Sequence, residues 1–247
     1  MTALLAAGVS QAGETSDDQA RRFYATAGVG FDYSTGDYGD PVKSHFFAPS
    51  LFGKVEYEPI TLKVSIPYVV VDGGLIVGEG GGGGGSTATR DGIGDIVTTV
   101  IYSYFPDNEY LPTIIEPSVK LKIPTGSEKE GLGTGKTDVS FGLELTQTLG
   151  SVTVFGSGAY RVKTGGTYDN IWLASLGANV KIGDRASAGL AYDFRQASTN
   201  SVGDSHELVP MASFRVSDQL RFGPYAVIGL STNAPDWGLG GMLTVNF

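Results

Sequence analysis

Along most of the chain, apolar and polar side chains alternate with the period of two that is typical of β-strands. Between Phe23 and Tyr33, the odd positions carry Phe, Ala, Val and Tyr, whereas the even positions carry Tyr, Thr, Gly and Asp. No stretch shows the period of an amphipathic helix. Each alternating stretch spans about ten residues and ends in a turn rich in Gly, Asp, Asn or Pro, which predicts an all-β fold.

The pattern predicts about twelve strands. They are residues 23–33, 46–57, 61–71, 95–105, 113–123, 137–149, 151–161, 171–182, 186–196, 206–215, 220–231 and 237–247. A single alternating stretch is weak evidence, but a regular series of this length indicates one extended sheet.

The connections between the expected strands alternate in length. The short ones are residues 58–60, 106–112, 149–150, 183–185 and 217–219, and the long ones are 34–45, 72–94, 124–136, 162–170, 197–205 and 232–236. Bacterial outer-membrane barrels have short periplasmic turns, longer extracellular loops and an even number of strands. We therefore predict a single antiparallel transmembrane β-barrel whose termini both lie on the periplasmic side.

Two features favour a barrel over a soluble β-sandwich, which also alternates. Aromatic side chains such as Tyr57, Tyr68 and Trp172 gather at the ends of the apolar faces, where barrels place their interfacial girdles. The polar faces are rich in Gly, Ser, Ala and Thr, which suits a confined interior. The last strand ends on Phe247 and resembles the signal that the outer-membrane assembly machinery recognises. We expect that machinery and outer-membrane lipid as partners.

The N-terminus has a different character from the rest of the chain. Residues 1–12 form a short apolar stretch that ends in small residues, with Ser10-Gln11-Ala12 as a cleavage site. We interpret residues 1–12 as the remnant of a signal peptide, 13–22 as a periplasmic segment and 23–247 as the barrel. A frayed apolar terminus is the alternative.

Composition removes several classes of function. The chain has no Cys and two His, which excludes disulfides, zinc ribbons, iron–sulfur clusters and a three-His metal site. Its net charge of −9 argues against nucleic acid as a partner. We expect no cofactor and no metal.

Alternation places nine basic and seven acidic side chains on the inner face. They are Lys54, Lys63, Lys120, Lys122, Arg161, Lys181, Arg195, Arg215 and Arg221, and Asp32, Glu56, Asp95, Glu116, Glu144, Asp193 and Glu207. The net negative charge therefore comes from loops, rims and tail. Twelve strands predict a narrow lumen, because eight are filled by side chains and about sixteen leave a wide channel. Two interpretations stay open: a structural ion-pair lattice or a permeation path.

Enzymatic motifs are weak. Gly131 to Thr137 lacks the spacing of a phosphate-binding loop and is interpreted as a flexible turn. Ser44 beside His45 and Ser205 beside His206 are the candidates for a hydrolytic pair, but no nucleophile elbow is present. We predict that the chain is not an enzyme and has no catalytic residue. The run from Gly80 to Gly85 predicts a mobile external loop.

Three blocks resemble a known family. They are Gly92-Ile-Gly-Asp95, Lys122-Ile-Pro-Thr-Gly126 and Gly133-Thr-Gly-Lys-Thr-Asp138, each beside an expected strand. They are similar to the outer-membrane transporters called the "MetA-pathway of phenol degradation" family, and the similarity runs from about Tyr24 to Phe247. The matching polar and glycine positions are Asp95, Lys122, Thr125, Gly126, Gly135 and Asp138. The resemblance implies a Gram-negative outer-membrane channel, sometimes associated with aromatic compounds, and we expect an ion pair between Asp95 and Lys122.

These observations predict an outer-membrane channel that passively conducts small solutes, aromatic or weakly anionic ones among them. The first alternative is a structural or adhesive barrel with an occluded lumen. The second is an outer-membrane lipid hydrolase.

Overall fold

The computed structural model describes residues 23–77, 88–106, 113–165, 168–200 and 202–247. The predicted signal-peptide remnant (1–12), the predicted periplasmic segment (13–22) and the predicted Gly80 to Gly85 loop lie outside these residues. No helix in the described part of the chain is long and apolar enough to cross a membrane.

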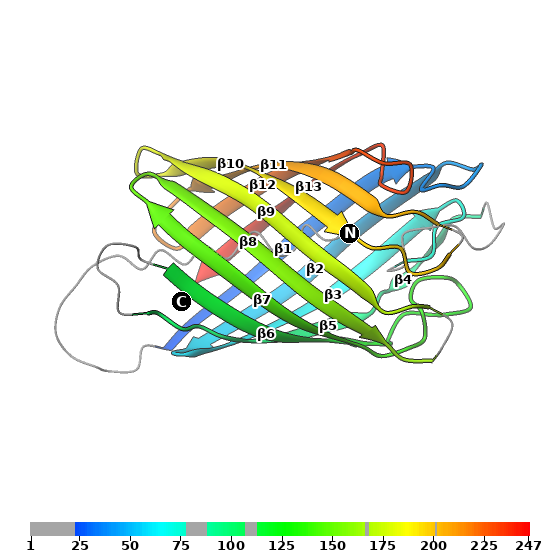
Figure 1. Cartoon of the computed structure of the whole chain (residues 1–247), viewed down its shortest axis with the longest axis horizontal. Coiled ribbons are helices and arrows are strands. Elements are labelled where there is room, and N and C mark those ends of the chain that lie inside the picture. Colours follow the sequence, from blue (N-terminus) through cyan, green and yellow to red (C-terminus); the bar gives the residue numbers. More distant parts are fainter. Residues whose placement is uncertain (1–22, 78–87, 107–112, 166–167, 201) are drawn as a thin grey trace.

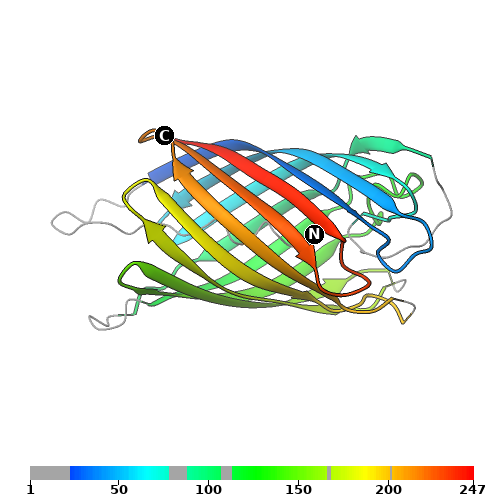
Figure 2. The ribbon, with the colours of Figure 1, turned by 90° about the horizontal axis from the view of Figure 1, so that it is seen from above.

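The described residues form one closed antiparallel sheet (Figure 1). Its strands are β1 (Phe23–Gly36), β2 (Ser44–Tyr57), β3 (Ile60–Asp72), β4 (Arg90–Ile93), β5 (Ile96–Tyr102), β6 (Thr113–Ile123), β7 (Asp138–Leu149), β8 (Val152–Lys163), β9 (Ile171–Ile182), β10 (Ala186–Arg195), β11 (Ser205–Arg215), β12 (Leu220–Gly229) and β13 (Trp237–Asn246). Apart from β4 and β5, strands that follow each other in the chain pair with each other, and β1 pairs with β13, which closes the barrel (Figure 2). The predicted fold class is confirmed.

Strands β4 and β5 share one position in the barrel, because both pair with β3. Tyr68 lies opposite Ile93 and Ser65 lies opposite Val97, so residues 94–96 oppose only two residues of β3. This extra residue is a β-bulge. Residues 90–93 form strand β4, so the prediction that they belong to the loop 72–94 is wrong. The bulge shifts the alternation by one residue and so hides the continuation of the strand.

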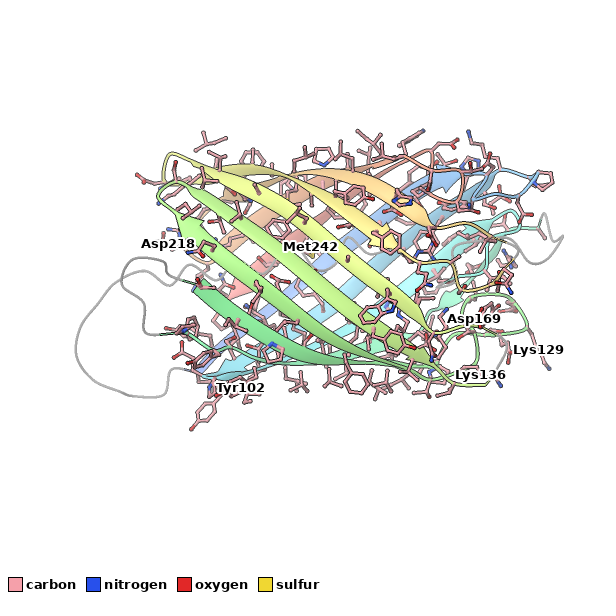
Figure 3. All side chains as sticks on the ribbon, in the orientation of Figure 1. Tyr102, Lys129, Lys136, Asp169, Asp218 and Met242 are labelled. Atoms are coloured by element: carbon pink, nitrogen blue, oxygen red, sulfur yellow. The ribbon has the colours of Figure 1, made fainter. Side chains whose placement is uncertain are left out.

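The two ends of the barrel differ in their connections. Residues 58–59, 103–112, 150–151, 183–185 and 216–219 connect strands at one end, which we call the turn rim. Residues 37–43, 73–89, 124–137, 164–170, 196–204 and 230–236 connect them at the other, the loop rim, which lies near β4 in Figure 1. Lys129, Lys136 and Asp169 lie at the loop rim and Asp218 at the turn rim (Figure 3).

Apolar side chains point outward from the wall. Leu176, Trp172 and Phe141 expose 67%, 57% and 54% of their surface, and Tyr102 points away from the barrel in Figure 3. Residues that point to the inner face, such as Thr61, Ser140 and Asp193, are buried. An apolar outer surface is favourable only in contact with lipid, because in water it would expose a large hydrophobic area.

Three aromatic rings on the inner face pack against glycines of the adjacent strand. Phe52 lies opposite Gly28, Phe155 opposite Gly177 and Tyr225 opposite Gly240. A side chain at Gly177 would lie 2.8 Å from the carbonyl oxygen of Leu190 and would also meet the Phe155 ring. The glycines therefore let these rings lie along the wall instead of filling the lumen.

Candidate functional site

The structure places all of the predicted lumen charges at inner-face positions of their strands, with Asp95 in the bulge between β4 and β5. Lys181, Arg215 and Arg221 lie at the turn rim, where Lys181 is exposed. Asp32 lies on β1 and accepts a hydrogen bond from the Tyr225 hydroxyl. Eight of the other twelve charges fall into two rows, and Glu56, Asp95, Lys122 and Arg195 lie outside them. Arg195 is buried at the loop-rim end of β10, opposite Ser205.

The first row is basic and crosses six strands. Its members are consecutive cross-strand partners: Lys54, Lys63, Thr99, Lys120, Ser140 and Arg161. Lys54 lies three residues from the turn-rim end of β2, whereas Arg161 lies two residues from the loop-rim end of β8. Because the strands are tilted, this basic row climbs the inner wall from one rim towards the other.

The second row is acidic and crosses strands β6 to β11. Its consecutive partners are Glu116, Glu144, Ser157, Ser175, Asp193 and Glu207. Hydroxyl groups stabilise these carboxylates: Ser103 donates to Glu116 at 2.7 Å and Ser175 donates to Asp193 at 2.6 Å. Ser205 likewise donates to Glu207 at 2.9 Å.

Charges of like sign therefore lie directly opposite each other on neighbouring strands. The pairs are Lys54 with Lys63, Glu116 with Glu144, Asp193 with Glu207, and Arg215 with Arg221. Like charges in this position are destabilising. A structural lattice would alternate the signs, so this arrangement does not support the lattice interpretation for these residues.

A cavity lies between the two rows, over strands β6 to β10. Its lining includes Lys120 and Ser140 of the basic row and Glu144, Ser157, Ser175 and Asp193 of the acidic row, with Ser118, Gly142 and Ala159 between them. Ser118, Gly142 and Ala159 are consecutive cross-strand partners with short side chains. Their small size leaves the space between the rows open.

Two ion-pair sites do have a structural character. Lys54 Nζ lies 2.6 Å from Glu56 Oε2 on the same strand. Lys122 Nζ lies 3.3 Å from Asp95 Oδ2 and 3.0 Å from Asp138 Oδ2. The expected ion pair between Asp95 and Lys122 is therefore present, and Asp138 completes it.

The three sequence blocks behind the family resemblance meet at one place, which we call the motif junction: Asp95, Lys122, Thr125, Gly126 and Asp138. Thr125 Oγ1 donates to the Gly94 carbonyl at 2.7 Å and accepts from the Ile96 amide at 3.0 Å. Asp95 Oδ1 accepts from the Gly126 amide at 2.9 Å. These bonds satisfy backbone groups that the bulge leaves without ladder partners.

Two inner-face charges, Asp138 and Lys163, are absent from the predicted set. Both are buried. Asp138 lies within the predicted strand 137–149, whereas Lys163 lies two residues beyond the predicted strand 151–161. Asp138 has the same parity as Glu144, and Lys163 the same parity as Arg161. Applying the period of two along the whole predicted strand would have found Asp138, and one more step beyond Arg161 would have found Lys163.

Apolar residues from three loops and from strands β2 and β3 pack inside the loop rim. This loop-rim cluster consists of Tyr38, Phe46, Ala48, Val69, Val71, Leu75 and Leu132. The Arg90 guanidinium holds two of the loops together by donating to the carbonyl oxygens of Gly73, Leu75 and Glu130 at 2.7, 3.0 and 2.9 Å. The segment around Leu132 was predicted to be a flexible turn, but it is a packed loop.

Tyr38 anchors the loop between β1 and β2 in this cluster. Its hydroxyl lies 2.7 Å from the Ser34 hydroxyl, and its backbone has a φ of 52°, in the left-handed region. Burial raises the pKa of Tyr38 to about 12, an effect that the bond to Ser34 only partly offsets. The phenol therefore remains neutral under all physiological conditions.

A second inner cluster contains Phe155, Ala191, Val209 and Val227, with Met211 and Tyr225 packed against it. On β10, Ala191 of this cluster and Asp193 of the acidic row point to the same inner face. Ala191 comes two residues earlier, so the cluster lies nearer the turn rim than the acidic row. This cluster gives the inner wall an apolar, partly aromatic surface.

Neither serine–histidine pair has the geometry of a catalytic dyad. Ser44 is buried on the inner face, whereas His45 lies on the outer face with Nδ1 3.2 Å from the Tyr33 hydroxyl. Ser205 is likewise buried beside Glu207, and His206 Nδ1 lies 2.6 Å from the exposed Tyr192 hydroxyl. Adjacent strand residues point to opposite faces, so each histidine is separated from its serine by the wall. Among the described residues, no group of three or more His, Asp or Glu side chains has the geometry to hold a metal ion.

A closed antiparallel barrel with a lipid-facing exterior and a charged interior defines a bacterial outer-membrane barrel. The chain belongs to the "MetA-pathway of phenol degradation" family, whose model matches residues 58–247. The predicted family and the outer-membrane location are thereby confirmed.

Solved outer-membrane barrels share this fold. The COG4313 outer membrane channel from Pseudomonas putida F1 matches with a TM-score of 0.73 and 17% identity, over 94% of this chain and 100% of that one. The KdgM porin matches with a TM-score of 0.58 and 7% identity, over 89% and 99%. The translocator domain of the autotransporter NalP from Neisseria meningitidis matches with a TM-score of 0.50 and 11% identity, over 91% and 88%. At these identities the likeness concerns the fold.

Proposed function

We propose that this protein is an outer-membrane channel that passively conducts small solutes, and that weakly anionic solutes are among them. The observation that carries the proposal is the segregation of charge on the inner wall, where Lys54 faces Lys63 and Glu116 faces Glu144. Like charges that face each other lower the stability of the barrel. Their presence is explained if the charges act on molecules that enter the lumen.

The basic row supports the preference for anions. Within the described residues, no carboxylate lies within ion-pair distance of Lys63 or Lys120. Both ammonium groups are therefore available to attract a carboxylate along a row that climbs between the rims. The second inner cluster, which includes Phe155 and Val209, supports contact with an aromatic ring in the same solute.

We propose in the same way that the chain is not an enzyme, since both serine–histidine candidates are split across the wall. A structural or adhesive barrel with an occluded lumen is the competing function. Packing of Leu75 and Leu132 inside the loop rim narrows that entrance, so the two functions differ in whether a water path remains.

Purified protein in planar lipid bilayers tests the proposal. The channel function predicts discrete conductance steps with a preference for anions, and swelling of proteoliposomes in small carboxylates. A folded barrel that gives neither conductance nor swelling would establish the occluded alternative.

A further inference from the structure

The cavity between the two rows has opposite charges at its two ends. On β6, Lys120 and Glu116 lie four residues apart on the same face, which corresponds to about 13 Å along a strand. On the neighbouring β7, Ser140 lies opposite Lys120 and Glu144 lies opposite Glu116. A positive end and a negative end therefore face one space, with short side chains between them.

In the described part of the protein, neither Lys120 nor Glu144 has an oppositely charged group within ion-pair distance. The Lys120 ammonium has no ion pair or hydrogen bond there, and its charged neighbours Lys63 and Arg161 have the same sign. Glu144 accepts a hydrogen bond from Thr146 and lies opposite Glu116, and the base that acts on it, Lys63, lies beyond ion-pair distance. Charges in a confined space favour a counter-charge, so each end of the cavity favours the opposite sign in a ligand.

A ligand with a single charge matches only one of these ends. A carboxylate beside Lys120 leaves Glu144 uncompensated, and an ammonium beside Glu144 leaves Lys120 uncompensated. A molecule with both groups matches the two ends together, but only if several atoms separate its charges. An α-amino acid, whose charged groups share one carbon, is too short to reach both rows.

We propose that this cavity binds an elongated zwitterion, with the carboxylate towards Lys120 and the ammonium towards Glu144. Ser140 lies at the basic end and Ser157 and Ser175 at the acidic end, where their hydroxyls supply further hydrogen bonds. The inference rests on the proposed function, since it names the class of solute that the channel selects.

Calorimetric titration of the full-length protein in detergent tests the site with 6-aminohexanoate as the probe. Hexanoate and hexylamine, each with one of the two charges, are the matched comparisons, and glycine is the short zwitterion. We expect 6-aminohexanoate to bind at least about tenfold more tightly than any of the three, since one extra charge-assisted contact corresponds to about that factor.

Two substitutions separate the ends of the cavity. Lys120→Gln is expected to weaken 6-aminohexanoate about tenfold and to leave hexylamine unchanged, whereas Glu144→Gln is expected to weaken 6-aminohexanoate and leave hexanoate unchanged. Arg185→Gln removes an exposed charge from the turn between β9 and β10 and is expected to change nothing. Comparison of gel mobility before and after heating verifies that each variant is folded.

Conductance of the same preparations distinguishes the two proposals. If the wild-type protein conducts but binds 6-aminohexanoate no better than hexanoate and hexylamine, the zwitterion site is refuted and the channel function stands. If 6-aminohexanoate binds with the predicted pattern but no conductance or swelling is found, the site is supported and the channel function fails.

Discussion

Lys63 lies directly opposite Lys54 on the inner face of the barrel, and only Lys54 has an acidic partner, Glu56, within ion-pair distance among the described residues. Two facing ammonium groups with one carboxylate in ion-pair contact leave a net positive charge on this part of the wall. Anions in the lumen are attracted to it, because charges interact strongly in a narrow pore with low-dielectric walls.

Replacing Lys63 with Gln removes this excess charge while it preserves much of the length of the side chain. We expect the permeability ratio of anions over cations to fall about fivefold, which corresponds to the loss of about 1 kcal/mol of attraction. The measurement is the reversal potential under a salt gradient across a planar bilayer. The control is Arg185→Gln, in the exposed turn between β9 and β10. An unchanged reversal potential in both variants would show that the basic row does not face the permeating ions.

Replacing Lys122 with Met should destabilise the barrel. The side chains of Lys122, Asp95 and Asp138 are 14%, 10% and 4% exposed, so the substitution leaves two largely buried carboxylates without a counter-charge. The expected loss is about 3 kcal/mol in the free energy of unfolding, measured by urea denaturation in lipid vesicles.

The control for this experiment is Lys43→Met. Lys43 pairs with Asp236 at 2.8 Å, and this contact raises its pKa, but both side chains are about half exposed in the loops. Water and salt screen such a pair, so we expect little change in stability. Equal effects of the two substitutions would contradict a structural role for the motif junction.

Replacing Arg90 with Ala should loosen the loop rim. The substitution removes three hydrogen bonds from a charged donor to the carbonyls of Gly73, Leu75 and Glu130. We expect trypsin to cleave after the exposed Lys129 at least about tenfold faster, because local opening becomes easier. Arg185→Ala, at the turn rim, serves as the control. Protection of Lys129 in the Arg90→Ala variant would show that other contacts hold the loop.

The loop rim should also lose stability at alkaline pH through Tyr38. Burial raises the pKa of this phenol from its ordinary value of 10.0 to about 12, so the folded state retains a proton that the unfolded state releases. This contribution to stability is complete below pH 10 and is lost as the pH rises towards 12. The ultraviolet difference between wild type and Tyr38→Phe should show phenolate formation only near pH 12. Ionisation near pH 10 would place Tyr38 in water.

The strands were predictable because a membrane barrel imposes a strict period of two, with lipid on one face and the lumen on the other. The strands at 113–123 and 171–182 have the predicted boundaries. The same period places Lys63, Lys120 and Glu144 on the inner face. It failed at Arg90 to Ile93, because the bulge reverses the phase of the alternation.

The rows themselves were not predictable from the sequence. Which charges become neighbours depends on the stagger between strands, and that stagger is set by connection lengths and bulges rather than by alternation. Lys120 and Ser140 are twenty positions apart in the chain, and nothing in the local pattern indicates that they lie opposite each other. The packed loop around Leu132 depends in the same way on the distant Arg90.

The proposed channel requires that the wall between the two rows faces a water path. The chain contains no cysteine, so a single introduced thiol tests this directly. Single variants Ser118→Cys and Val119→Cys place a thiol on the inner face and on the exposed outer face of the same strand. A charged methanethiosulfonate reagent is added to one side of a bilayer containing each variant. We predict that Ser118→Cys is modified and its conductance falls, while Val119→Cys is unaffected. A folded Ser118→Cys barrel that resists the reagent from both sides would contradict a water path along this wall.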